Sequence, residues 1–181
     1  MTDPTVEAWP EPPLAGTEAA AVLGALERRR ASSAWKCSGL RATLGPSTIT
    51  LGGLLKHLAH VEDSRLARLW LGSPVGAPWD AVDRYSAPDR DHRSAAEDTP
   101  EALHTLRRGA VARSRAVVDE ALGSGGLDQL VACATRSGER PNLRRVLLDL
   151  VEEYARHADH ADHADLIRES VDGLTGEDPP R

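Results

Sequence analysis

Histidines dominate the chemistry that this sequence could perform. The chain reads His-Ala-Asp three times in succession, which places His157, His160 and His163 close together. A segment about a hundred residues earlier carries His57 and His60. Neutral imidazole is the commonest side-chain ligand for metals at physiological pH. If the two segments are helices that face each other, the sequence predicts a metal site between them.

The directions of these side chains follow from the turn of about 100° per residue of an α-helix. Relative to Glu153, His157 lies near about +40° and His160 near about −20°, on one face. His163 lies near about −80°, at the margin of that face. Together with His57, which lies on the apolar side of its own segment, two ligands from this face would make a three-ligand site. Three protein ligands with one open position are the pattern of catalytic zinc, and iron, nickel or manganese could use the same set with added waters.

The same residues also fit roles without a metal. His57 would then be a core histidine with one hydrogen bond. The His-Ala-Asp triplet would be a polar helix end, where protonated histidine suits the helix dipole. The two cysteines, Cys37 and Cys133, give neither a disulfide framework nor a zinc ribbon. We expect both to pack as small apolar residues rather than to act as nucleophiles.

Composition limits the possible classes of protein. A chain of 181 residues fits one domain, and its core must be built from Leu, Ala and Val, since it has no Phe. That core suits helix-on-helix packing better than a β-sandwich. The net charge of −6 argues against nucleic-acid binding. The chain shows neither an apolar run that could cross a membrane nor a signal-peptide pattern, so we expect a cytoplasmic protein.

Capping and breaking residues divide the chain into elements. They predict four helices over residues 17–35, 48 or 50 to 71, 99–122 and 142–171, capped by Thr17, Thr48 or Thr50, Thr99 and Asn142. On the first helix, Glu27 to Arg30 are expected to be exposed. Residues 72–98 form a long crossover, and such a loop often covers a site or an interface. The result is an all-α four-helix bundle. The expected limits are an irregular N-terminal segment 1–14, the bundle 15–173 and a C-terminal tail 174–181.

Several segments in order resemble a known family. They are Gly53–Glu62 (GLLKHLAHVE), Leu147–His157 (LLDLVEEYARH), Arg30–Leu40 and Ser137–Arg140. The chain resembles the DinB-like superfamily, and most closely an actinobacterial branch of uncharacterised domains. That branch is related to mycothiol-dependent maleylpyruvate isomerases and bacillithiol transferases. The resemblance covers residues 15 to 173.

The resemblance implies a fold and a ligand set. The fold is an up-down-down-up four-helix bundle with a long crossover, often a homodimer. One His of the second helix and two ligands of the last helix hold the metal, and His57 matches the first. The repeated triplet allows His157 with His160, or His160 with His163, and some relatives would use Glu153 with His157. We select His57, His157 and His160.

The resemblance also implies an activity. Characterised relatives use a low-molecular-weight thiol, mycothiol in actinobacteria, and a divalent metal such as zinc, nickel or iron. The metal lowers the pKa of the thiol, which then attacks an electrophilic small molecule. Two alternatives stay open. One is a non-catalytic dimeric bundle that binds a metal or ligand, and the other is a hydrolase with Glu153 or Glu62 as base.

Overall fold

The computed structural model describes residues 9–38, 49–80, 89–158 and 163–176, and every regular element within them is helical. The elements are α1 (Glu18–Lys36), α2 (Leu51–Asp63) with a π-helical continuation (Ser64–Trp70), α3 (Arg90–Ser94), a 3₁₀ turn (Ala95–Glu97), α4 (Pro100–Ser124), a 3₁₀ turn (Gly126–Asp128), α5 (Leu143–Ala158) and α6 (His163–Val171). Among these described helices, none has the length and apolarity needed to span a membrane.

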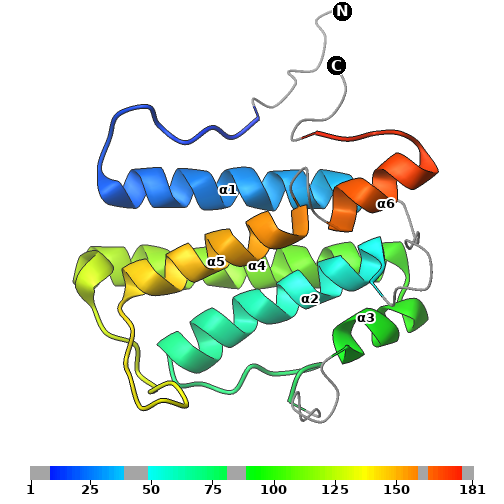
Figure 1. The fold of residues 1–181 in the computed structure, drawn as a ribbon. Coiled ribbons are helices and arrows are strands. Elements are labelled where there is room, and N and C mark those ends of the chain that lie inside the picture. The colour runs from blue at the N-terminus through cyan, green and yellow to red at the C-terminus, as the bar shows by residue number, and fades with distance from the viewer. Residues whose placement is uncertain (1–8, 39–48, 81–88, 159–162, 177–181) are drawn as a thin grey trace, which may run out of the picture.

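The long helices form the bundle that the sequence predicts. Helices α1 and α5 run in one direction and α2 and α4 in the other, which is the up-down-down-up order (Figure 1). Helix α2 packs along α4, and α1 packs along α5. The all-α prediction is therefore confirmed.

Side-chain caps fix where the long helices begin. Thr17, Thr50 and Thr99 each accept a hydrogen bond from the backbone N–H three residues later, at 3.2, 2.9 and 3.2 Å. Asn142 accepts in the same way from the N–H of Arg145 at 3.0 Å. Such bonds satisfy N–H groups that have no partner within the helix. The predicted caps are confirmed, with Thr50 as the cap of α2.

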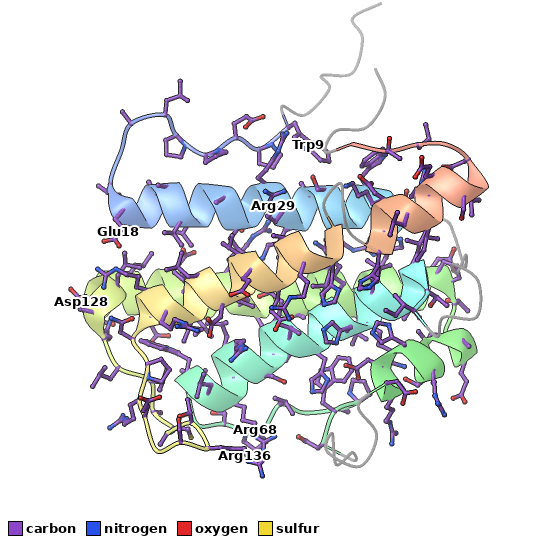
Figure 2. All side chains as sticks on the ribbon, viewed as in Figure 1. Trp9, Glu18, Arg29, Arg68, Asp128 and Arg136 are labelled. Carbon is purple, nitrogen blue, oxygen red and sulfur yellow. The ribbon has the colours of Figure 1, made fainter. Side chains whose placement is uncertain are left out.

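Ion pairs join the elements at one end of the bundle. Arg144, near the start of α5, donates to Glu18 at the start of α1 and to Asp128 in the second 3₁₀ turn. Glu18 and Asp128 lie at the same end of the molecule in Figure 2. Because both carboxylates are largely exposed, these contacts orient the chain more than they stabilise it.

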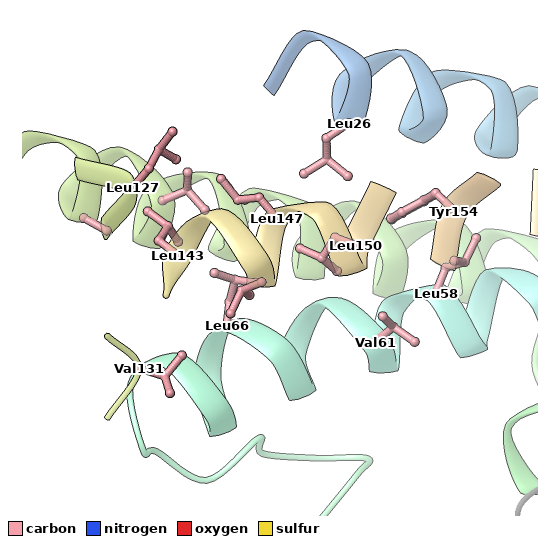
Figure 3. Packing of buried hydrophobic residues seen from close by; sticks show 13 residues of the cluster. Leu26, Leu58, Val61, Leu66, Leu127, Val131, Leu143, Leu147, Leu150 and Tyr154 are labelled. Atoms are coloured by element: carbon pink, nitrogen blue, oxygen red, sulfur yellow. The ribbon is translucent and has the colours of Figure 1, made fainter. Parts of the chain in front are cut away.

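The core is built from leucine and valine of all four long helices. Leu26 of α1, Leu58 of α2, Val118 of α4 and Leu150 of α5 belong to one buried cluster (Figure 3). Tyr154 of α5 is the largest fully buried side chain in the described residues. Its phenol needs a hydrogen-bond partner at this depth.

A buried ion pair supplies that partner and corrects one prediction. Arg30 was expected to be exposed, but it is 4% exposed, and Glu62 is fully buried. Glu62 accepts hydrogen bonds from Arg30 Nε and Nη2, both at 2.7 Å, and from the hydroxyl of Tyr154 at 2.9 Å. Since these bonds engage both carboxylate oxygens of Glu62, its suggested role as the base of a hydrolase is wrong.

The last predicted helix is also corrected. One helix was expected from residue 142 to 171, but the structure has two, α5 and α6. Residues six apart on one continuous helix are separated by about 9 Å along its axis. The ring centroids of His157 and His163 lie only 5.7 Å apart. The predicted direction of His163 relative to Glu153 is therefore wrong, because His157 and His163 lie on different helices.

Candidate metal centre

Four imidazoles from four helices meet at one end of the bundle. His57 of α2, His92 of α3, His157 of α5 and His163 of α6 form what we call the histidine cluster. The ring centroid of His57 lies 5.5 Å from that of His92 and 5.1 Å from that of His157, and His163 stacks on His157. In Figure 1 this is the end where α2 begins and α5 ends.

Three side chains of this region offer a set of metal ligands. His57, Glu153 and His157 each have one donor atom within 4.8 Å of the others, and all three are half-buried. Glu153 Oε2 lies 3.8 Å from His157 Nε2. The structure thus brings together two of the three selected residues, with Glu153, the alternative ligand. His160, the third selected residue, lies outside the described residues.

Asp91 orients the two histidines of α2. Its Oδ2 lies 3.3 Å from Nδ1 of His57 and 3.0 Å from Nδ1 of His60. Burial alone would raise the pKa of Asp91, but the hydrogen bonds from His57 and His60 lower it well below its usual range. A carboxylate that accepts a hydrogen bond from Nδ1 leaves the Nε2 lone pair of His57 for a metal, a common arrangement at metal-binding histidines.

Trp79 holds His60 from the other side. Their ring planes are 6° apart and the centroids are separated by 4.5 Å, so the rings stack. The indole Nε1 of Trp79 donates to Asp63 at 2.9 Å, and the side chain is buried. The crossover thus covers this part of α2, as a long loop near a site was expected to do.

The protonation state of His157 suits a metal ligand. Burial lowers the pKa of His157 to about 3, and the neighbouring His57, His163 and His92 act in the same direction. The ring is therefore neutral at neutral pH, which is the form that binds metals. Among the described residues, the Nδ1 atoms of His92, His157 and His163 are buried without a hydrogen-bond partner. The neutral His157 ring, the unpartnered imidazole nitrogens and one carboxylate together fit a divalent cation.

A glycine lets α3 reach the cluster. A Cβ atom at Gly53 would lie 2.7 Å from Nδ1 of His92 and 2.9 Å from its Cα, closer than real contacts allow. Sequence reasoning missed Asp91 and His92, because a crossover has no periodicity that would place its side chains. The available signals were the Asp-His pair itself and the two glycines in the first turn of α2.

Replacing Asp91 with Asn is expected to weaken metal binding by about 10- to 100-fold. The neutral amide would no longer provide the charged hydrogen-bond acceptor that orients the ring of His57. The measurement is a zinc titration against a chromophoric chelator. Asp89→Asn is the matched control, since it removes the same charge beside α3 but pairs with Arg93. Equal losses in both variants would show that only the overall charge matters.

The two cysteines have different environments. Cys37 is buried, and burial raises the pKa of its thiol to about 12, although Arg107 and Lys36 act in the opposite direction. The expectation that Cys37 packs as a buried residue is confirmed. Cys133 is exposed, so the expectation that it packs as a buried residue is wrong.

The native protein is expected to present one reactive thiol to Ellman's reagent at pH 8, and two after unfolding in guanidinium. Thiolates are the reacting species, and the Cys37 thiol stays protonated and covered in the fold. Counting thiols before and after denaturation measures this directly. In Cys133→Ser the native signal should vanish, and a remaining fast thiol would contradict the burial of Cys37.

Comparison with known proteins agrees with this architecture. A family model described as Mycothiol-S-transferase matches residues 21–173, which include every helix of the bundle except the start of α1 and contain the whole histidine cluster. Neither the curated proteins nor the solved structures contained a match. Because the match spans most of the sequence, the chain belongs to the mycothiol-S-transferase family.

Proposed function

We propose that this protein is a divalent-metal-dependent transferase that joins the sulfur of mycothiol to an electrophilic small molecule. The observation that carries the proposal is the ligand set of His57, Glu153 and His157 in a chain of this family. Three ligands from protein leave room for a thiol and a substrate at the same ion.

The described residues divide the work. His57 and His157 would hold the metal, with Glu153 or His160 as the third ligand and zinc, nickel or iron as the ion. A bound divalent metal lowers the pKa of a coordinating thiol and so supplies a thiolate at neutral pH. Asp91, whose Oδ2 lies 3.3 Å from Nδ1 of His57, would keep the proton of that ring on Nδ1.

His92 is the described group best suited to accept the proton of the thiol. Its Nδ1 is buried and unpartnered among the described residues, and its ring lies 5.5 Å from that of His57. Burial and the proximity of His57 lower the pKa of His92, which favours the neutral ring that can accept a proton but also makes it a weaker base.

The test combines metal content with thiol turnover. The protein, purified without a His tag, is analysed for metals and then mixed with mycothiol and monobromobimane, and the conjugate is quantified. We expect conjugation above the uncatalysed rate that is lost with a chelator and restored by one metal, with glutathione as the control thiol. Stoichiometric metal without thiol turnover would instead favour a non-catalytic metal-binding bundle.

A homodimer in the cytoplasm is part of the same proposal. Support comes from the resemblance to dimeric relatives and from the two free cysteines, which suit a reducing compartment. Sedimentation analysis of the full chain at two concentrations decides the oligomeric state.

A further inference from the structure

A large groove lies between α1 and α4, away from the histidine cluster. Its volume is about 860 Å³, and we call it the α1–α4 groove. Leu26, Val111 and Val118 give it an apolar floor, and Arg30 and Arg107 lie among them. No residue of the histidine cluster lines it. The groove is therefore a separate cavity that the proposed transfer reaction does not use.

Arg107 is a buried cation without a carboxylate partner in the part of the chain that the structure describes. The side chain is 5% exposed, and Nη2 donates to the backbone oxygen of Arg30 and to Ser33 Oγ. Arg30 and Arg115, which also line the groove, differ because they pair with Glu62 and Glu27. The guanidinium also lies 5.7 Å from the ring centroid of Tyr154, but a ring face and neutral oxygens carry no full negative charge. Since a buried charge is costly without an opposite charge, an anionic ligand would stabilise this side chain.

The unpartnered polar atoms of the groove are all donors within the described residues. Arg107 Nε and Trp9 Nε1 are buried without a hydrogen-bond partner, and both residues line the groove. An N–H group needs an acceptor, and two such groups favour an oxygen-bearing anion over a cation. Arg108, which is exposed, adds a further positive charge at the rim.

From this arrangement we propose that the α1–α4 groove binds a small amphipathic carboxylate. The carboxylate lies at Arg107 and accepts hydrogen bonds there, and the apolar part covers Leu26, Val111 and Val118. Carboxylate–guanidinium contacts are among the strongest hydrogen bonds in proteins. The apolar floor selects against small hydrophilic anions, because burial of the hydrocarbon supplies the remaining affinity.

The probe is octanoate, titrated into the full-length protein by calorimetry, with octanol as its uncharged counterpart. We expect octanoate to bind and Arg107→Met to weaken it by about tenfold or more, with little change for octanol. Arg68→Met is the matched control. It removes the same charge from an exposed position on the opposite side of the bundle from Trp9 (Figure 2) and should leave octanoate binding unchanged.

Two further variants distinguish binding in the α1–α4 groove from binding at the histidine cluster and from occupation of the groove by a second copy of the chain. Carboxylates also bind metals, so His57→Ala must retain octanoate binding, and a loss there would move the site to the histidine cluster and overturn the proposal. Ala34→Trp fills the groove from α1 and should abolish octanoate binding. This variant tests the groove as the binding site even if circular dichroism shows that Arg107→Met is unfolded. Equal affinity for octanoate and octanol would overturn the proposal. The proposal would also be overturned if the protein is a dimer that does not bind octanoate and that Ala34→Trp dissociates. A second copy of the chain would then fill the groove.

Discussion

His57→Ala is expected to abolish stoichiometric metal binding. In the proposed centre, His57 is the ligand from α2, while Glu153 and His157 both come from α5. Without it, the remaining ligands lie on one helix, and the ion loses the side chain that Asp91 orients. The loss should exceed the roughly 10- to 100-fold that is typical of removing an orienting partner alone. Elemental analysis and a chelator-competition titration measure both stoichiometry and affinity.

Two comparisons make this result specific. His104→Ala removes a histidine of α4 that belongs to neither the ligand set nor the cluster, so it should leave metal binding unchanged. Glu153→Gln and His160→Ala then identify the third ligand, because only the true ligand should match the loss seen with His57→Ala. If the protein binds metal as well without His57 as with it, the proposed centre is wrong.

The sequence predicted the helical bundle, and it predicted that His57 and His157 lie together, which the structure shows. Caps at Thr17, Thr50 and Thr99 are local interactions, so residue type and spacing were enough to predict them. His57 and His157 could be paired because each lies on the inner face of a periodic helix, and two facing helices bring such faces together. Local pattern and tertiary structure agree at these positions.

Asp91 and His92 show where that reasoning ends. They lie in a short helix of the crossover, 34 and 35 residues after His57, and no periodicity relates them to α2. Their position depends on how the crossover folds back over Gly53, which is a tertiary property. The burial of Arg30 and Glu62 was not predicted for a related reason. Charged residues are rarely buried unless they are paired, and the two partners of this pair are 32 residues apart in the sequence.

Glu62→Gln is expected to lower the free energy of unfolding by about 3–5 kcal/mol, the range for breaking a buried ion pair. The amide would leave Arg30 without its bidentate partner in the core, and Glu27 would remain as the only carboxylate paired with it among the described residues. The amide keeps one acceptor oxygen but places an NH2 group at the other position, where either Arg30 Nη2 or the pair of Arg30 Nε and Tyr154 needs an acceptor. Urea denaturation followed by circular dichroism measures the change.

The control for charge alone is Glu152→Gln, whose carboxylate pairs with Arg156 on the surface and should contribute less than about 1 kcal/mol. A double variant, Arg30→Met with Glu62→Met, removes both charges and should recover much of the stability, because apolar replacements of buried pairs are often neutral.

Since the Glu62–Tyr154 hydrogen bond joins the helices that carry His57 and His157, Glu62→Gln should also weaken metal binding, whereas Glu152→Gln should not. A Glu62→Gln protein with unchanged stability would show that Arg30 finds another partner, and the network would then not fix α2 against α5.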